Sequence, residues 1–433
     1  MDQVQFLQRF KQLKGIDETA NLLQQAEIRV HWKGLIGSSK SLASAAVCEQ
    51  VPGNHLFVLE DKESAAYFLN DLEQMYPESN QVFFYPASYR TPYQFEETDN
   101  ANVVARAEVL EKINSGKNNW IVTYPQALFE RVPTQKKLSE NTLRVETGKS
   151  YSIDFLNELL LEYGFERVDF VYEPGQFAIR GGIVDVFSFS NDLPFRMEFF
   201  GDEVDSIRTF DPVSQLSVQP HIHFSIVPNV QKQLILDGNG TFLEFIGNQA
   251  VVWLASNDLV KGTLEKEYQK AVACYDKLPQ NTIRHSLPSE LYMHPSDWKE
   301  QIEKNTVVEF GPEYHFPAHK TITFETNHQP TFNKDFELLK DDLQARSSKG
   351  MRNFIFSNQP KQLERLYQIF EDIGAEVDFQ TLPFALHEGF ILPELKWVCY
   401  TDHQIFERYH RFKLKEGFRQ AKQALTLKEI YNL

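Results

Sequence analysis

The first 135 residues alternate between short apolar runs and longer amphipathic segments, and this alternation constrains the fold more than any other feature. The apolar runs have the length of buried strands: Ile28–Trp32, His55–Leu59, Val82–Tyr85 and Trp120–Tyr124. Between two of them, Lys62–Met75 repeats its apolar residues at the period of a helix. Strands that are separated by helices pair in parallel, with the helices as crossovers. The sequence therefore predicts the α/β class, with a doubly wound layer at its start.

This rhythm changes along the chain of 433 residues, and the changes predict several domains. Short alternating runs between glycine and proline turns, which are typical of antiparallel hairpins, follow the first layer. We predict five segments: 1–135, the first part of the α/β domain; 136–215, an inserted α+β module; 216–330, the second part of the α/β domain; 331–412, a small third α/β domain; and 413–433, a basic linker.

Three local expectations complete this division. Pro and His are frequent from Pro288 to Pro330, which predicts mostly loops in that region. In the third domain, Glu376–Phe379 has the composition of a strand and Gln404–His410 that of a helix. The tail carries many basic residues and few acidic ones, which favours an exposed helix or linker.

The charge balance argues against non-specific binding of nucleic acid. Lys and Arg total 44 and Asp and Glu total 60, which gives a net charge of −16. Because nucleic-acid affinity depends on cationic side chains that displace counterions, a protein or small-ligand partner is expected instead. The three cysteines are widely spaced, which fits a reducing cytoplasm. No run approaches the ~20 apolar residues that a bilayer requires. The N-terminus has no secretory signal, so we expect no membrane partner.

The segment Gly34–Ser41 is a damaged version of a phosphate-binding loop. The pattern G-x-x-x-x-G-K-[ST] supplies backbone N–H groups and a lysine to phosphates and a hydroxyl to Mg²⁺. Gly34, Lys40 and Ser41 satisfy it, but Ser39 stands where the second glycine belongs. A Cβ at that crowded position obstructs the wrapping of the backbone around a phosphate.

Two interpretations of this loop remain open. An active nucleotide hydrolase would also require acidic residues after an apolar strand to hold the metal. Glu60-Asp61 and Asn257-Asp258 are the candidates. The first pair, however, lies on the strand directly after the loop's helix, and the second has only one carboxylate. The alternative is a helix-opening turn in a domain that has lost its nucleotide. We expect the second, and with it no catalytic residue, no cofactor and no metal.

The most distinctive stretch runs from Tyr172 to Arg208. Gly181-Gly182 predicts a tight turn between two strands, and we expect Arg180, Arg196 and Phe200 on neighbouring strands. Arginine suits bidentate pairing with a partner's carboxylates, and an exposed phenylalanine can anchor an interface. The alternative is that the arginines pair only with Glu198 or Glu203 across the sheet, and residue types alone favour that alternative.

The motifs F-x-x-R-G-G-x-x-D-x-F, at Phe177–Phe187, and P-x-R-x-E-F-F-G-D-E-x-x-x-I, at Pro194–Ile207, resemble a known module. It is the UvrA-binding module shared by the nucleotide-excision protein UvrB and the transcription-repair coupling factor (Mfd) family. The resemblance extends to Tyr85–Tyr93, Trp120–Phe129 and Lys396–Arg411 and is weakest from about 225 to 335. UvrB would carry an intact loop and a long aromatic β-hairpin, for which residues 86–101 are too short and too acidic. The coupling-factor family is therefore favoured.

The resemblance implies a fold and a role in transcription-coupled nucleotide-excision repair. The α/β domain would be a degenerate, UvrB-like P-loop domain, and the module would recruit UvrA through Arg180, Arg196 and Phe200. The sequence would be an N-terminal fragment without catalysis, cut before the polymerase-binding and motor domains. The full-length parent would be an ATP-driven DNA translocase that contacts RNA polymerase and DNA and masks the module with its own C-terminal domain. A third option is a scaffold whose arginines serve only their own sheet.

Overall fold

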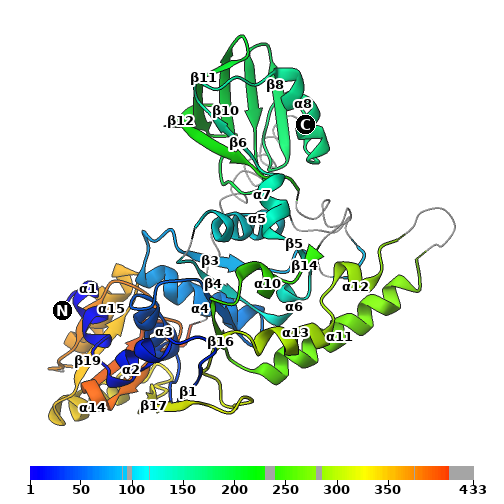
Figure 1. Ribbon diagram of the computed structural model, residues 1–433. Coiled ribbons are helices and arrows are strands. Elements are labelled where there is room, and N and C mark those ends of the chain that lie inside the picture. Colours follow the sequence, from blue (N-terminus) through cyan, green and yellow to red (C-terminus); the bar gives the residue numbers. More distant parts are fainter. Residues whose placement is uncertain are drawn as a thin grey trace.

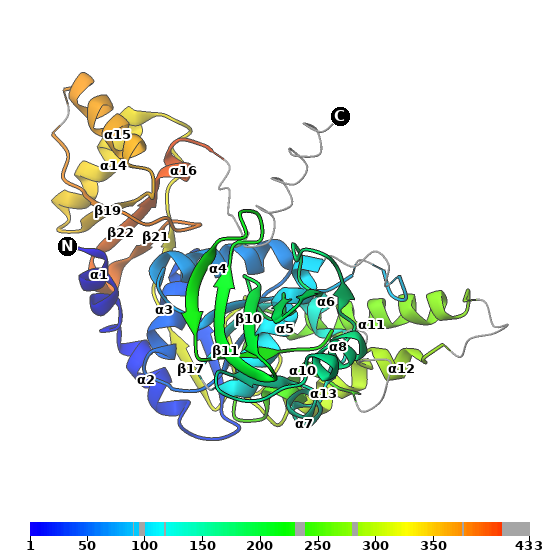
Figure 2. The same cartoon turned by 90° about the horizontal axis from the view of Figure 1, so that it is seen from above.

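The computed structural model describes residues 1–89, 91–94, 100–116, 118–229, 239–278, 285–374 and 376–408. These residues build a parallel sheet with helices, an inserted sheet module and a smaller third domain (Figure 1). The third domain lies beside α1 (Gln3–Phe10). The inserted module and the third domain lie on different sides of the parallel sheet, as Figure 2 shows from above. The predicted multi-domain α/β class is confirmed.

A parallel sheet forms the centre of the first domain. Its strand order is β17-β1-β16-β15-β2-β4-β3, and every neighbouring pair in it is parallel. All residues of β2, β4, β15 and β16 are buried, as expected for strands that helices cover on both faces. The strands are β1 (Arg29–Lys33), β2 (His55–Val58), β3 (Val82–Tyr85), β4 (Trp120–Thr123), β15 (Val251–Leu254), β16 (Thr306–Glu309) and β17 (Lys320–Thr323).

Helices connect these strands, and the local sequence sets their limits. The helix α4 (Lys62–Met75) has the predicted bounds because the Asp61 carboxylate accepts a hydrogen bond from the Ser64 amide, 2.8 Å away, at its N-terminus. The other elements of this domain are α2 (Lys14–Leu22), α3 (Ser39–Cys48), α5 (Asn100–Ser115), α6 (Pro125–Leu128), α7 (Gln135–Glu140), α10 (Phe242–Ile246), α11 (Asn257–Tyr275), α12 (Pro288–Leu291), α13 (Pro295–Ile302) and the short paired strands β5 (Val132–Pro133) and β14 (Asn239–Gly240).

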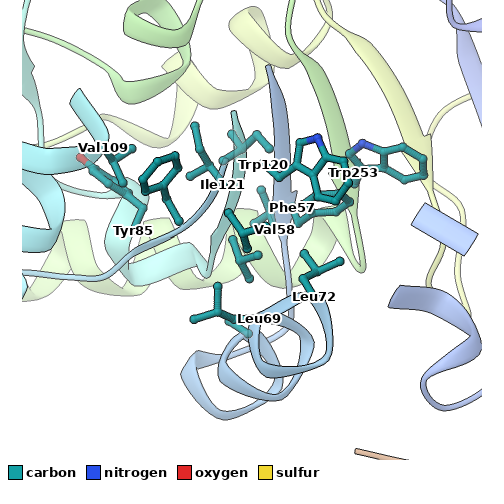
Figure 3. Packing of buried hydrophobic residues seen from close by; sticks show 14 of the residues in the cluster. Phe57, Val58, Leu69, Leu72, Tyr85, Val109, Trp120, Ile121 and Trp253 are labelled. Atoms are coloured by element: carbon teal, nitrogen blue, oxygen red, sulfur yellow. The ribbon is translucent and has the colours of Figure 1, made fainter. Parts of the chain in front are cut away.

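The core of the first domain lies between the sheet and these helices. In Figure 3, Phe57 and Trp253 from neighbouring strands lie close together, and their ring centroids are 5.4 Å apart. Leu69 and Leu72 of α4 extend toward the same sheet, and Leu72 is fully buried. Burying each such side chain stabilises the fold by about 1.5–3 kcal/mol.

The prediction of mostly loops between Pro288 and Pro330 is wrong. That region contains α12, α13 and three strands, among them β16, which lies between β1 and β15 in the middle of the sheet. The apolar run of β16 is only four residues long, and it pairs with β1, in which Arg29 lies opposite Val307, far earlier in the chain. Burial in a preformed sheet, rather than local propensity, determines this strand.

The inserted module (residues 143–229) contains a six-stranded sheet, a two-stranded ladder and one helix. The sheet order is β12-β11-β10-β9-β8-β7, and its pairs are antiparallel except β7 with β8. The elements are β6 (Leu143–Glu146), α8 (Ile153–Glu162), β7 (Glu166–Arg167), β8 (Gln176–Arg180), β9 (Ile183–Val186), β10 (Phe195–Phe200), β11 (Glu203–Phe210), β12 (Ser217–His221) and β13 (His223–Ile226).

The module's strands continue past residue 215, where the sequence placed its end. β12 pairs with β11, with Pro220 opposite Arg208. β13 pairs with β6, with Phe224 opposite Val145. The last strand therefore pairs with the first one, so that the segments where the chain enters and leaves the module lie next to each other.

The third domain has a five-stranded sheet of order β18-β21-β22-β19-β20. The helix α1 from the N-terminus packs into the core of this domain. The Phe6 ring stacks on Trp397, with ring centroids 4.6 Å apart, and contacts Phe354 edge to face. The elements are β18 (Asn327–His328), α14 (Phe336–Ser348), β19 (Arg352–Phe356), α15 (Pro360–Asp372), β20 (Gln380–Leu382), β21 (Phe390–Leu392), the 3₁₀ helix η2 (Pro393–Leu395), β22 (Trp397–Thr401) and α16 (Asp402–Ile405).

Two local expectations for the third domain are corrected. The strand expected over Glu376–Phe379 is wrong, and β20 comes next in the chain instead. The carbonyls of Glu376 and Asp378 accept hydrogen bonds from the side-chain amides of Gln344 and Asn353, so they do not join the ladder. The helix expected over Gln404–His410 is α16, which ends at Ile405, and residues 409 and 410 lie outside the described residues.

The basic segment 413–433 also lies outside the described residues. Within the described ranges, none of the helices combines the length and the apolar character that crossing a membrane would require.

Replacing Phe6 with alanine tests whether α1 is part of the third domain's core. Phe6 is fully buried among aromatic rings, so its removal leaves a cavity and should lower the free energy of unfolding by about 3–5 kcal/mol. Urea denaturation followed by tryptophan fluorescence measures the change. Val4→Ala is the matched control on the same helix, because Val4 is 63% exposed, and a shift within about 0.5 kcal/mol is expected for it. Equal effects of the two substitutions would contradict this role of α1.

Candidate partner-binding site and the Gly34–Ser41 loop

Two glycine turns set the register of the strands that carry the predicted binding residues. Gly181 has φ +61° in the β8–β9 turn, and Gly201 has φ +62° in the β10–β11 turn. Side chains disfavour this left-handed conformation, whereas glycine adopts it freely. At Gly182, a Cβ would lie 3.0 Å from the carbonyl oxygen of Phe199. The predicted tight turn at Gly181-Gly182 is confirmed.

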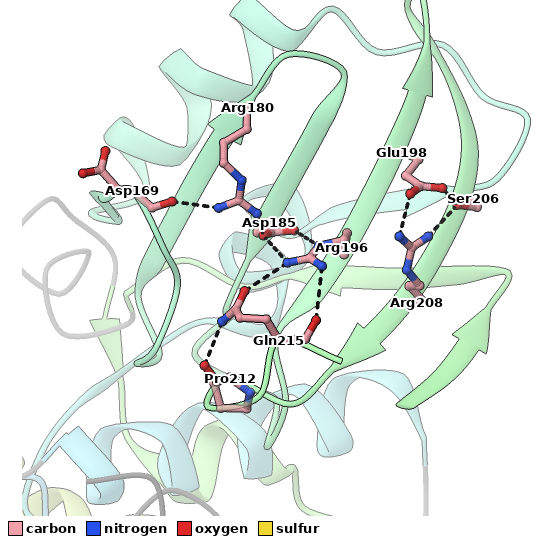
Figure 4. A network of polar contacts seen from close by, with 9 residues as sticks. All are labelled: Asp169, Arg180, Asp185, Arg196, Glu198, Ser206, Arg208, Pro212 and Gln215. Carbon is pink, nitrogen blue, oxygen red and sulfur yellow. Dashed lines mark hydrogen bonds and ion pairs between the residues drawn. The ribbon is translucent and has the colours of Figure 1, made fainter. Parts of the chain in front are cut away.

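The Asp185 carboxylate joins both predicted arginines on one face of this sheet (Figure 4). Asp185 on β9 lies directly opposite Arg196 on β10, and its Oδ1 and Oδ2 accept bonds from the Arg196 Nε and Nη2 at 2.7 and 2.8 Å. Arg180 on β8 reaches the same Oδ2 from the other side. The two arginines thus share one carboxylate, although β9 separates their strands, so the expectation that these strands are neighbours is corrected.

Further contacts hold each guanidinium on this face. Arg180 Nη1 donates to the Asp169 carbonyl at 2.7 Å. Arg196 Nη2 and Nη1 donate to Oε1 and the carbonyl of Gln215 at 3.1 and 3.4 Å. The Arg196 guanidinium also lies over the Phe210 ring, 4.3 Å from its centroid. The exposed fractions of the side chains are 34% for Arg180, 13% for Arg196 and zero for Asp185.

Phe200 lies where β10 ends, four residues beyond Arg196, and it is 85% exposed. Because water disfavours exposed apolar surface, this ring would gain free energy if a partner covered it. More than half of the large apolar side chains that are exposed in the described residues lie within the inserted module. Of these side chains, Phe200 is the most exposed.

The alternative pairing partners named from the sequence are not the ones that the arginines use. Glu198 pairs with Arg208 on β11 and accepts a bond from the Ser206 hydroxyl at 2.9 Å. The hydrogen bond from Arg208, with that from Ser206, lowers the pKa of Glu198 to about 2. Sequence reasoning missed Asp185, although the spacing R-G-G-x-x-D around a two-glycine turn could have indicated it, since the turn folds Asp185 back toward Arg180.

The Gly34–Ser41 loop is the second candidate site. Hydrogen bonds within the protein already occupy the hydroxyl groups of its serines. The Ser39 hydroxyl accepts a bond from the Ile36 amide at 2.9 Å and donates to the Ile36 carbonyl. The Ser41 hydroxyl, which would ligate Mg²⁺ in an active loop, donates to the Asp71 carboxylate at 2.7 Å. Ser39 and Ser41 are both buried. The expected obstruction at Ser39 thus takes the form of a side chain that bonds to its own turn.

A segment of the third domain covers this loop. The Ser38 amide donates to the Glu388 carbonyl at 3.0 Å, and the Glu388 amide donates back to the Ser38 hydroxyl at 3.0 Å. A Cβ at Gly37 would lie 3.1 Å from the Glu388 carbonyl oxygen. The His387 amide donates to Asp71 at 2.7 Å. A protein carbonyl therefore takes a backbone donor that a phosphate would need.

The acidic residues proposed as metal holders have other contacts. Asp61 caps α4, and Asp258 pairs with His315 at 3.2 Å. The Asn257 side chain accepts a bond from the buried Trp298 indole at 2.9 Å. Among the described residues, no group of three or more His, Cys, Asp or Glu side chains is placed to hold a metal ion.

The segment that carries Arg180 and Arg196 matches a known protein family. Residues 143–231 match the family model of the UvrB interaction domain. This match includes the Asp185 network, the hairpin of Phe200 and both strands that lie past residue 215.

The chain is similar to two kinds of repair protein over about half of its length. It is 28% identical to the transcription-repair-coupling factor of Bacillus subtilis over 203 residues, and 31% identical to that of Myxococcus xanthus over 206. These alignments cover 47% and 46% of this chain but only 17% of each relative. It is 29% identical to the UvrABC system protein B of Ureaplasma parvum over 217 residues, covering 47% of this chain and 32% of that protein. The resemblance to the coupling-factor and UvrB families is confirmed.

Asp71 gives the covered loop a testable pH dependence. Burial raises the pKa of Asp71 to about 6, with the nearby Glu388 charge adding to the rise and the bonds from Ser41 and His387 opposing it. The folded state therefore holds a proton that the unfolded state releases between about pH 4 and 6. The stability from this group is present at low pH and is lost as the pH rises through that window, by roughly 3 kcal/mol. In Asp71→Asn, the decline of the unfolding free energy from pH 4.5 to pH 7 should be smaller by about 2 kcal/mol, because part of the loss already lies below pH 4.5.

Urea denaturation at both pH values measures this difference. Asp61→Asn is a control at the N-terminus of the same helix, because Asp61 is exposed and asparagine can also cap α4. Parallel pH profiles for the unmodified protein and Asp71→Asn would contradict a raised pKa at Asp71.

Proposed function

We propose that this chain acts in transcription-coupled nucleotide-excision repair by recruiting UvrA through the inserted module. The observation that carries this proposal is the pair of guanidinium groups held by one buried carboxylate, on a domain that matches the UvrB interaction domain. Arg180, Arg196 and Phe200 are the proposed UvrA-binding residues. The names of the relatives, a transcription-repair-coupling factor and a protein of the UvrABC system, support this pathway.

The chemistry of the face defines what the partner surface must offer. Two guanidinium groups and one carboxylate leave one net positive charge at the network, and the Arg208–Glu198 pair beside it is neutral. A carboxylate of the partner would satisfy the remaining N–H donors of Arg180. The exposed Phe200 ring requires an apolar pocket, which is the usual arrangement of an interface hot spot.

We propose that the described part of the chain has no catalytic activity and uses no cofactor. Lys40 and Ser41 favour the second candidate, a P-loop nucleotide hydrolase. Against it stand the closed turn at Ser39 and the Glu388 carbonyl on the Ser38 amide. Nucleotide binding would have to break both contacts and also the Ser41–Asp71 bond.

The remaining activities of the family belong to longer proteins. The matched relatives are much longer than the aligned region, which is 17% of the coupling factors. A longer protein of this kind would recruit UvrA in the cytoplasm. Its other domains would contact RNA polymerase and DNA and drive translocation along DNA with ATP. The protein's own C-terminal domain could then cover the module until it is needed.

Phe200→Ala tests the proposed recruitment. Removing a hot-spot side chain should cost about 2 kcal/mol or more, so the Kd for purified UvrA should rise roughly thirtyfold. Isothermal titration calorimetry measures the Kd, and circular dichroism checks the fold. Leu161→Ala is the matched control, because Leu161 is 52% exposed on α8, and α8 packs Leu160 into the core of the module.

The control variant should bind UvrA with an affinity within about threefold of the unmodified chain, as near-neutral surface positions do. Failure of the unmodified chain to bind UvrA would refute the proposed function. Unchanged binding of Phe200→Ala, with UvrA still bound by the unmodified chain, would place the contact away from Phe200.

The hydrolase alternative has a direct test of its own. Titration of the chain with Mg·ATP at millimolar concentrations should give no binding heat, because the loop donors are already bonded within the protein. Saturable binding that Lys40→Ala abolishes would favour the hydrolase instead.

A further inference from the structure

We infer that the two arginines of this face have different roles: Arg180 contacts the partner, whereas Arg196 is a positioning residue that acts through Asp185. This inference rests on the proposed function and deepens it. It follows from how many donors of each guanidinium the protein itself occupies, from the exposure of the two side chains and from the burial of the carboxylate between them.

Arg196 has few donors left for a partner. A guanidinium has five N–H groups, and four hydrogen bonds run from Arg196 to Asp185 and Gln215. The Phe210 ring covers one side of its plane. Only 13% of the side chain is exposed. A residue that is this fully engaged within its own domain is suited to holding other groups in place.

Gln215 is part of the same support. Its backbone has φ +60°, a conformation that is uncommon for a residue with a side chain. Its side-chain amide donates to the Pro212 carbonyl at 2.7 Å, which leaves its oxygen facing Arg196. The loop before β12 therefore binds the Arg196 guanidinium through Gln215, on the side away from Asp185 (Figure 4).

Arg180 is more open. It makes two hydrogen bonds, to the Asp169 carbonyl and to Asp185, and 34% of its side chain is exposed. Its guanidinium lies 5.0 Å from the centroid of the Phe170 ring, which is itself half exposed. Arg180 thus keeps donors for a partner carboxylate, next to an apolar side chain that the partner can also cover.

Asp185 couples the two arginines. Its carboxylate is fully buried, and a buried charge that loses a partner is strongly unfavourable. Removal of Arg196 leaves this carboxylate to Arg180 alone, which draws Arg180 toward the sheet and away from a partner. Removal of the Asp185 charge leaves two guanidinium groups that repel each other. Either change disturbs Arg180 without touching it.

A double-mutant cycle on Asp185 and Arg196 tests this coupling. Asp185→Asn and Arg196→Gln should each raise the Kd for UvrA by about tenfold or more, and the double variant should be no weaker than the weaker single variant, because both changes remove one shared function. An Arg196 that touched the partner independently would give losses that multiply.

Binding kinetics separate the two roles further. An exposed charge at an interface mainly affects the association rate and its salt dependence, whereas a buried, hydrogen-bonded charge mainly affects dissociation. Arg180→Gln should therefore flatten the salt dependence of the association rate, and Arg196→Gln should mainly raise the dissociation rate. Arg208→Gln is the matched control, since Arg208 pairs with Glu198 on the same face, and its Kd should stay within about threefold.

Each variant is compared with the unmodified chain by thermal unfolding. If Asp185→Asn does not fold, Arg196→Lys replaces it, because lysine keeps the charge but cannot fork onto Asp185 and Gln215. Unchanged UvrA binding in Asp185→Asn or Arg196→Lys, or multiplicative losses in the cycle, would overturn the inference while leaving the proposed function in place. Absence of UvrA binding by the unmodified chain would refute the proposed function, and the inference with it.

Discussion

One buried carboxylate organises the sheet face that carries Arg180 and Arg196. Asp185 lies on the central strand of three, and it holds an arginine from each side. Losing one partner of a buried ion pair typically costs about 3–5 kcal/mol, because the remaining charge is left without compensation. The network is therefore a rigid unit that fixes where the guanidinium groups point. A rigid, pre-positioned surface binds with a smaller loss of conformational entropy than a mobile one.

The rest of the molecule provides a stable base for that face. The module leaves and rejoins the first domain through β6 and β13, which pair with each other. The first domain is in turn tied to the third domain at the Gly34–Ser41 loop, where Ser38 and Glu388 exchange hydrogen bonds and Asp71 receives a third. A loop that resembles a damaged phosphate-binding loop thus serves as a contact between two domains. The same backbone donors can satisfy either a phosphate or a carbonyl, and here they satisfy the carbonyl.

The sequence predicts those parts of the structure that local chemistry decides. The Asp61 cap and the apolar period define α4, and Gly181-Gly182 defines the turn between β8 and β9. The sequence does not reveal β16, because its short apolar run becomes a strand only between β1 and β15. It also misplaces β20, since side-chain amides take the carbonyls of the expected strand. For the candidate site, the sequence predicts Arg180, Arg196 and Phe200, whereas the pairing of both arginines with Asp185 depends on cross-strand register.

Hydrogen exchange of the chain with and without UvrA measures the central claim most directly. Amides in contact surfaces exchange more slowly when a partner covers or rigidifies them. We expect UvrA to slow exchange within β8 to β11 of the inserted module and to leave exchange in the Gly34–Ser41 loop and in the 385–389 segment unchanged. Protection confined to the loop or to the third domain, with no change in β8 to β11, would contradict this expectation.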